Sequence, residues 1–174
     1  MRLARISLVV LLGIVLVPTV ACSSTPEFVT YTDNTNGYSM SIPTSWDTVS
    51  WGDAGTFYGA PSQCSEGDIM ADVIAKDTHI SSLQTLYEVS KNRAEDMEGF
   101  AFISEEETTI DGIPAMKLMY MYTDVSTGDT YQELSCFLLQ GNTSWLISFW
   151  CLPDCWDMYE GTFDTMANSF HVLD

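Results

Sequence analysis

The sequence predicts an α+β fold built around an antiparallel β-sheet. Short apolar and β-branched segments alternate with turn signals, and two of these signals, Asp111-Gly112 and Gly141-Asn142, have strand-like residues on both sides. Such dipeptides are typical of hairpins, which join antiparallel strands. Two longer segments, 81–97 and 154–169, instead repeat apolar residues every three or four positions, as amphipathic helices do. With 46% apolar residues, the chain can bury a core beneath these elements.

The first part of the chain is predicted to form short strands. Residues 28–32 and 38–42 flank the polar segment 33–37. A calcium loop is an alternative interpretation of this polar segment, but the Gly at position 6 and the Glu at position 12 of such a loop are missing. A hairpin turn is therefore predicted. Further strands are expected at 48–51, 56–60 and 69–75.

The two predicted helices each carry one apolar face. For 81–97, Ser81 and Gln84 are expected to form a capping box at the start, and Gly99 is expected to end the helix. The apolar face of 154–169 is rich in aromatic residues, which we expect to lie in the core.

The first strong hairpin signal joins strands predicted at 100–110 and 113–123. Three consecutive acidic residues lie in the first of these strands: Glu105, Glu106 and Glu107. Charges on a strand of this kind discourage pairing with other chains, so we expect these carboxylates to lie at a solvated edge.

The second hairpin signal allows a register to be predicted for strands 130–140 and 143–151. A two-residue turn at Gly141-Asn142 places Cys136 opposite Ile147. One face of this hairpin is then almost entirely apolar: Leu134, Cys136, Leu138, Trp145, Ile147, Phe149 and Cys151. The other face mixes polar residues with Tyr131, Phe137, Leu139, Leu146 and Trp150. This second face is too apolar to be bare, so a second layer or a partner surface should cover part of it.

The first residues of the chain have the layout of an export signal. Arg2 and Arg5 precede the apolar run 6–17, and small residues lead to Cys22. The end of the signal resembles a bacterial lipobox, which implies cleavage before Cys22, lipid attachment to its thiol and acylation of the new amino group. Two alternatives are a simple secretory signal and a membrane-spanning helix. The first has no need of this Cys, and the second needs about 20 apolar residues, more than the run supplies.

This interpretation divides the chain into a signal peptide at 1–21, a lipidated tether at 22–27 and one domain at 28–174. The protein is then expected at the cell membrane, anchored by its lipid on the extracytoplasmic side.

The charge of the chain is strongly negative. Its six Lys and Arg face 24 Asp and Glu, for a formal net charge of −18. Loss of Arg2 and Arg5 with the signal changes this to −20. Nucleic acid is excluded as a partner, because cationic side chains must neutralise its phosphates. The acidic charge has two interpretations: it attracts a basic partner, or it reflects adaptation to salt.

Four cysteines follow Cys22: Cys64, Cys136, Cys151 and Cys155. An even number in an exported chain suggests two disulfides. Cys151 with Cys155 and Cys64 with Cys136 is one expected arrangement, and Cys64 with Cys155 is another. A metal site at these cysteines is the less favoured interpretation.

No catalytic motif or phosphate-binding loop is evident in the sequence. Neither of the two histidines, His79 and His171, lies in a recognisable metal or catalytic motif. We therefore expect no catalytic residues, no resident metal and no cofactor.

Several motifs together resemble PsbP-like domains. They are Gly37-Tyr38-Ser39-Met40-Ser41-Ile42-Pro43 followed by Trp46, the segment 109–115, the segment 145–150, Trp156-Asp157-x-Tyr159 and Asn168-Ser169-Phe170. The resemblance spans about 28–172. It implies an antiparallel sheet with helices packed on both faces, and a protein that binds partners without catalysis.

The expected function is thus a membrane-tethered binding module for a protein partner or a small ligand. The candidate partner-binding residues are Glu105, Glu106, Glu107, Phe137, Leu146 and Trp150. A lipoprotein that binds divalent cations is the alternative, and a hydrolase is the third possibility.

Overall fold

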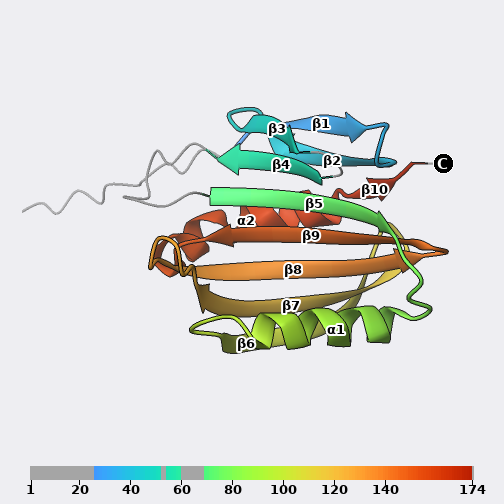
Figure 1. Ribbon diagram of the computed structural model, residues 1–174. Helices are drawn as coiled ribbons and strands as arrows, with labels where there is room; N and C mark the ends of the chain where they lie inside the picture. The colour runs from blue at the N-terminus through green and yellow to red at the C-terminus, as the bar shows by residue number, and fades with distance from the viewer. Residues whose placement is uncertain (1–25, 52–53, 60–68, 174) are drawn as a thin grey trace, which may run out of the picture.

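The computed structural model describes residues 26–51, 54–59 and 69–173 (Figure 1). The strands are β1 (Phe28–Asp33), β2 (Tyr38–Pro43), β3 (Asp47–Trp51), β4 (Ala54–Gly59), β5 (Ile69–Asp77), β6 (Ala101–Ile110), β7 (Ile113–Thr123), β8 (Thr130–Gln140), β9 (Thr143–Cys151) and β10 (His171–Val172). The helices are α1 (Leu83–Glu95), α2 (Trp156–Asn168) and the short 3-10 helix η1 (Pro153–Cys155). Within this part of the chain, every helix is too short or too polar to span a membrane. The predicted signal peptide and Cys22 lie outside the described residues.

Seven strands form the main antiparallel sheet, in the order β3-β4-β5-β9-β8-β7-β6. The register predicted for the second hairpin is confirmed, since Cys136 pairs with Ile147 and Gln140 pairs with Thr143. The first hairpin is confirmed as well. Its turn residues Asp111 (φ 55°) and Gly112 (φ 73°) adopt the left-handed conformation that a tight two-residue turn requires.

Three further strands form a second, smaller sheet in the order β1-β2-β10. The hairpin of β1 and β2 around the 33–37 turn agrees with the sequence prediction. Strand β10 was not predicted, because two residues are too few to show a period. It pairs His171 with Ser39 and Val172 with Tyr38, and so brings the end of the chain back to β2.

Helix α1 begins and ends slightly inside the predicted range. Its N-cap is Ser82, whose Oγ accepts a hydrogen bond from the Thr85 N–H at 3.1 Å, so the predicted Ser81–Gln84 box is wrong by one residue. Gly99 follows the helix at a φ of 67° and lies against Thr123. A Cβ at this position would come within 2.5 Å of the Thr123 hydroxyl, so the close approach itself requires a glycine.

One face of the main sheet is covered by α1 (Figure 1). Tyr87 and Ala94 of the helix pack on Leu118, Tyr120 and Phe137 of β7 and β8. The Tyr87 ring meets the Phe137 ring edge to face, with 5.8 Å between the centroids. The sequence predicted that a second layer or a partner covers part of this mixed face of the hairpin, and α1 is that layer.

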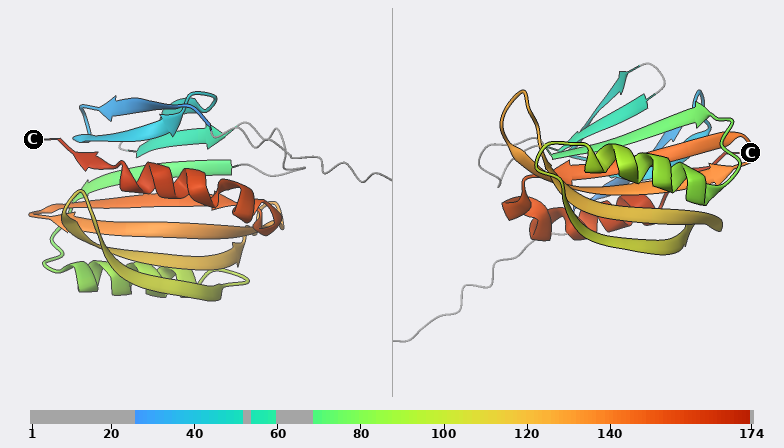
Figure 2. Two further views of the ribbon diagram at one scale, coloured as in Figure 1. Left: turned by 180° about the vertical axis from the view of Figure 1, so that it is seen from behind. Right: turned by 60° about the horizontal axis from the view of Figure 1, so that its bottom comes forward.

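The other face carries the larger core, together with α2 and the small sheet (Figure 2). At its centre Phe163 of α2 is fully buried, and its ring lies 5.3 Å from Phe149, 5.4 Å from Trp156 and 6.4 Å from Trp46. The α+β class with antiparallel sheets is therefore confirmed. The expected arrangement was one sheet with helices packed on both faces. In the structure a three-stranded sheet shares this face with α2.

The cysteines differ from the expectation that all four form disulfides. Cys136 and Cys151 are buried free thiols on the α2 side of the sheet, and burial raises the pKa of each to about 12. The expected pairs Cys151–Cys155 and Cys64–Cys136 are therefore wrong. Cys155 is disulfide-bonded, but its partner lies outside the described residues, as does Cys64. The pairing of Cys64 with Cys155 stays a prediction.

This arrangement predicts two thiols in the oxidised domain, not zero. With Cys22→Ser to remove the lipidation site, the mass under non-reducing conditions should lie about two hydrogens below that of the reduced form, the change for a single disulfide. Alkylation should label Cys136 and Cys151 only after denaturation, because both are buried. A mass about four hydrogens lower, or labelling of either thiol in the native protein, contradicts the prediction.

Candidate functional site

The acidic run predicted as a partner-binding site lies on β6, the edge strand of the main sheet, where residues 102–107 are all exposed. Glu105 already has a structural role. Its carboxylate accepts hydrogen bonds from the Tyr87 hydroxyl at 2.6 Å and from Lys91 Nζ at 2.7 Å. These bonds, from Lys91 first and Tyr87 second, hold the pKa of Glu105 below its usual range. Glu105 thus ties α1 to the sheet, while Glu106 and Glu107 remain exposed.

The three apolar candidates lie on the α1 side of the sheet. Phe137 is 3% exposed beneath α1, so no partner can reach it while the helix is in place. Leu146 is half-buried and packs against the same cluster. Trp150 is also half-buried and stands opposite Glu133 in the register. Only the exposed parts of Leu146 and Trp150 are available to a partner.

A buried carboxyl group occupies the same face. Glu133 accepts a hydrogen bond from the Ser135 hydroxyl at 2.6 Å, and the hydroxyls of Tyr120 and Ser148 also bond to it. Burial raises the pKa of Glu133 above its usual range, and nearby Asp72 acts in the same direction, while the three hydroxyls oppose the shift. The sequence showed these polar residues on one face but not that they would be buried together.

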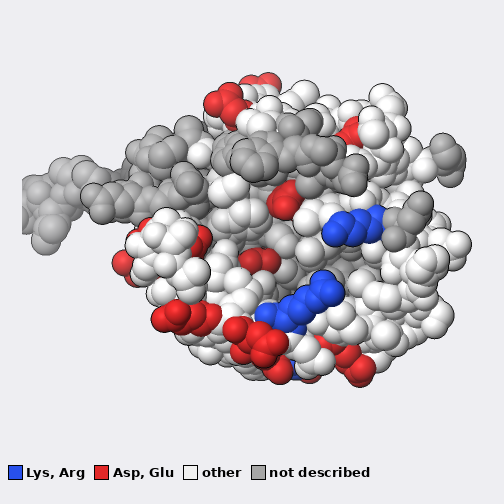
Figure 3. All heavy atoms as spheres, in the orientation of Figure 1, with Lys and Arg blue, Asp and Glu red and all other residues white. Residues whose placement is uncertain are grey.

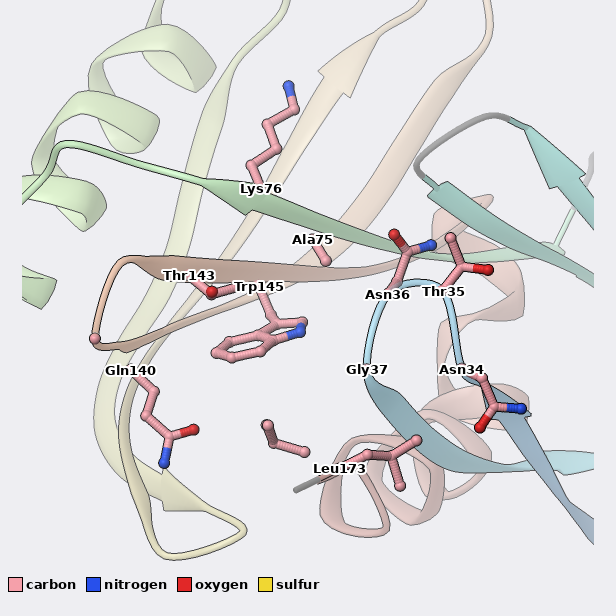
Figure 4. A pocket seen from close by; sticks show the side chains of 12 residues that line it. Asn34, Thr35, Asn36, Gly37, Ala75, Lys76, Gln140, Thr143, Trp145 and Leu173 are labelled. Atoms are coloured by element: carbon pink, nitrogen blue, oxygen red, sulfur yellow. The ribbon is translucent and has the colours of Figure 1, made fainter.

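The larger of two cavities lies at the end of the main sheet, and we call it the sheet-end pocket (Figure 4). It has a volume of about 880 Å³. Four separate parts of the chain line it: Asn34, Thr35, Asn36 and Gly37 of the β1–β2 turn; Ala75 and Lys76 of β5; Gln140, Gly141, Thr143 and Trp145 of the β8–β9 hairpin; and Val172 and Leu173 at the end of the chain.

The β1–β2 turn forms one rim of this pocket and is held by Asp33. The Asp33 carboxylate accepts the backbone N–H of Thr35 at 2.9 Å, the N–H of Asn36 at 3.0 Å and the Asn36 side-chain amide at 2.9 Å. Burial acts to raise the pKa of Asp33, but these bonds outweigh it and lower the pKa. Gly37 closes the turn at a φ of 67°, a conformation that favours glycine.

The end of the chain forms a second rim, held by a link to the β6–β7 turn. Asp111 accepts the backbone N–H of Val172 at 3.0 Å and lies 2.9 Å from Nδ1 of His171. The bond with His171 lowers the pKa of Asp111. Leu173 donates its N–H to the carbonyl of Gly37 at 2.8 Å, which joins this rim to the β1–β2 turn. His171 therefore serves to position β10.

Trp145 lies at the centre of the pocket lining (Figure 4). Its side chain is 4% exposed, and its buried indole nitrogen has no hydrogen-bond partner in the structure. Figure 4 shows this nitrogen directed toward the β1–β2 turn, across the space between the indole and Gly37. A buried donor without an acceptor costs about 1–3 kcal/mol, so an oxygen that displaces the atoms covering this N–H gains a hydrogen bond.

The charges of the pocket are few. Among the described residues that line it, Lys76 is the only charged one. In Figure 4 its ammonium group points away from Trp145, on the far side of β5. The acidic side chains visible in Figure 3 gather mainly over α1 and around its ends. Apart from Lys76 the described lining of the pocket is thus neutral, although the whole chain is strongly acidic.

A second, smaller cavity of about 270 Å³ lies between the β6–β7 hairpin and α2. Its lining is charged and includes Glu106, Lys117, Glu160 and Asp164. Within the described part of the chain, no three His, Cys, Asp or Glu side chains are placed to hold a metal ion together.

None of the residues that line the sheet-end pocket was among the candidates from the sequence. Its lining combines ordinary turn residues with a Trp that the hairpin pattern assigns to the core. The sequence features that could have indicated the pocket are its two turns, 33–37 and Gly141-Asn142. Only the fold brings these two turns together.

Comparisons with known proteins support the fold. The cyanobacterial PsbP of Synechocystis sp. PCC 6803 superposes with a TM-score of 0.60 at 19% identity, over 87% of this chain and 95% of that protein. LpqN of Mycobacterium tuberculosis, described as involved in cell envelope biogenesis, gives 0.58 at 12% identity, over 85% and 91%. PA94 of Pseudomonas aeruginosa, a protein of unknown function described as a putative regulator, gives 0.56 at 14% identity, over 79% and 91%. At these identities the similarity concerns the fold alone.

No curated protein matches the chain in sequence. The sequence profile of one family, described as PsbP-like protein, matches residues 18–172, which is almost the whole domain. This match agrees with the motifs from Gly37 to Phe170 that resemble the same group. The chain therefore belongs to the family of PsbP-like proteins.

Proposed function

We propose that the chain is a lipid-anchored, extracytoplasmic binding protein that holds a small ligand in the sheet-end pocket and performs no reaction on it. The observation that carries this proposal is the pocket itself. Its volume of about 880 Å³ falls in the range of known ligand sites, and its mostly polar lining also offers apolar contacts from Trp145 and Leu173. The unpaired Trp145 N–H, buried beneath the lining, is a hydrogen-bond donor for an oxygen that reaches it.

The anchor is the lipid on Cys22. Strand β1 begins at Phe28, so only a few residues separate the domain from the lipid. A tether this short keeps the pocket close to the membrane surface. The acidic domain is repelled by anionic lipid headgroups, which leaves the lipid as the attachment.

A fragment screen by two-dimensional NMR on the soluble domain tests the pocket. We expect weakly binding fragments to shift the backbone signals of Gly37 and Gly141 and the indole signal of Trp145. Ala75→Leu, which fills part of the pocket, should remove these shifts. Ala101→Leu, a matched change at a half-buried alanine of β6, should leave them unchanged.

Two results contradict the binding and the anchoring parts of the proposal. One is a screen in which fragments bind elsewhere and leave the signals of the pocket unchanged. The other is Cys22→Ser protein that is processed normally and still sediments with membranes. Conversion of a fragment to product by the purified domain would contradict the non-catalytic part.

A protein partner at the edge strand is the second candidate, favoured by the row of exposed residues on β6. An exposed edge can accept a strand from a partner, and Glu106 and Glu107 favour a basic one. Binding of this kind should weaken as salt rises, because screening shortens the range of charge attraction.

A further inference from the structure

We propose that the ligand of the sheet-end pocket is a neutral polyhydroxylated molecule, that is, a saccharide or a polyol. This inference rests on the proposed function of the pocket and narrows it to one chemical class. It is drawn from the charge, the hydrogen-bonding groups and the few apolar side chains of the lining.

The charge of the lining argues against ionic ligands. Asp and Glu are absent from the lining as described, although the chain has 24 of them. Its single cation, Lys76, directs its ammonium group away from the interior (Figure 4). An anionic or cationic ligand would lose its hydration without gaining an opposite charge, which is costly. A neutral polar ligand avoids this cost.

The polar groups of the lining match hydroxyls, which both donate and accept hydrogen bonds. The indole of Trp145 can only donate. Asn36 uses its amide nitrogen on Asp33, which leaves its carbonyl oxygen as an acceptor. Thr143 and Gln140 can do both. A ligand made of neighbouring hydroxyls can satisfy such a mixed set, whereas a carboxylate or an ammonium group satisfies only half of it.

The Trp145 N–H adds a specific requirement. It is buried and without a partner, and it faces the space between the indole and Gly37 (Figure 4). The surrounding atoms cover this N–H in the structure, and a ligand oxygen that displaces them relieves an unsatisfied donor. Leu173 and Ala75 lie beside it in the lining and offer apolar contact. Sugar rings present C–H groups between their hydroxyls, so they suit a wall of this mixed kind.

Titration of the domain with neutral and charged sugars built on the glucose ring tests the inference. The probes are glucose and maltose as neutral members, glucuronate as the anion and glucosamine as the cation. We expect the neutral probes to shift the Trp145 indole signal in NMR spectra and to bind at least tenfold more tightly than glucuronate or glucosamine.

Paired variants locate the effect. Trp145→Phe removes the N–H donor and should weaken the best neutral probe by about tenfold, the order expected when one hydrogen bond is lost. Trp156→Phe is the matched control, because its indole nitrogen is also buried and unpaired but lies outside the pocket. Thr143→Val should weaken binding, whereas Thr109→Val on exposed β6 and Lys76→Gln should not.

The possible failures are distinct. If glucuronate or glucosamine shifts the Trp145 signal while glucose and maltose do not, the neutral class is overturned. The pocket then remains a binding site. A loss of binding in Lys76→Gln equally overturns the neutral class, in favour of an anion. If all four sugars leave the Trp145 signal unchanged, the inference is overturned, and the fragment screen then decides separately whether the pocket binds small molecules at all.

Discussion

Phe163→Ala is expected to lower the free energy of unfolding by about 3–5 kcal/mol, the cost of removing a large aromatic side chain from a packed core. Phe163 is fully buried at the point where α2 meets β9 and the small sheet. Its ring packs on Phe149 of β9, on Trp156 of the same helix and on Trp46 of the β2–β3 connection, so the substitution leaves a cavity between α2, β9 and that connection. Urea denaturation followed by tryptophan fluorescence measures the loss.

Phe102→Ala is the matched control. The Phe102 side chain is 51% exposed on the edge strand β6, so removing it should change the stability by no more than about 0.5 kcal/mol. Equal losses in the two variants would show that Phe163 does not hold the layers together.

Glu133→Gln is expected to remove a pH dependence of stability. Burial raises the pKa of Glu133 in the folded state, so the folded protein binds this proton more tightly than the unfolded chain. The free energy of unfolding therefore falls as the pH rises from the unfolded pKa, near 4.5, through the raised folded pKa. Gln keeps an acceptor for the Ser135 and Tyr120 hydroxyls but cannot ionise, so this fall should disappear.

The other shifted carboxyls act at lower pH. Asp33, Glu105, Asp111 and Asp124 have lowered pKa values, so they stabilise the fold above their unfolded pKa and lose this contribution as the pH falls through the folded one. Urea titrations between pH 5 and 8 thus lie above the range in which these four carboxyls lose their contribution, and the difference between Glu133→Gln and the unaltered protein gives the part due to Glu133.

Two further variants complete the comparison. Glu106→Gln at the exposed edge should keep the pH slope of the unaltered protein. Glu133→Ala, which leaves buried hydroxyls without their acceptor, should cost about 1–3 kcal/mol. A Glu133→Gln variant with an unchanged slope contradicts the prediction.

The elements that the sequence predicted correctly depend on residues close together in the chain. Asp111-Gly112 and Gly141-Asn142 determine two hairpins and, for the second, its register, because a two-residue turn leaves no freedom in which residues face each other. The spacing of apolar residues likewise determines both helices to within a few residues of their ends.

The candidate site depends on residues far apart in the chain. Asn36, Ala75, Trp145 and Leu173 meet only after β5 pairs with β9 and the chain end pairs with β2 through β10. No local pattern encodes such a meeting.

The same holds for burial and for the cysteines. The alternation of β8 placed Phe137 on a mixed face, but whether a partner or α1 covers that face is decided by how the helix packs. It also placed Cys136 in an apolar row without showing that no second sulfur reaches it there. Turn type and side-chain period are local properties of the backbone, whereas pockets, burial and sulfur pairing require contacts that form only when distant segments pack together.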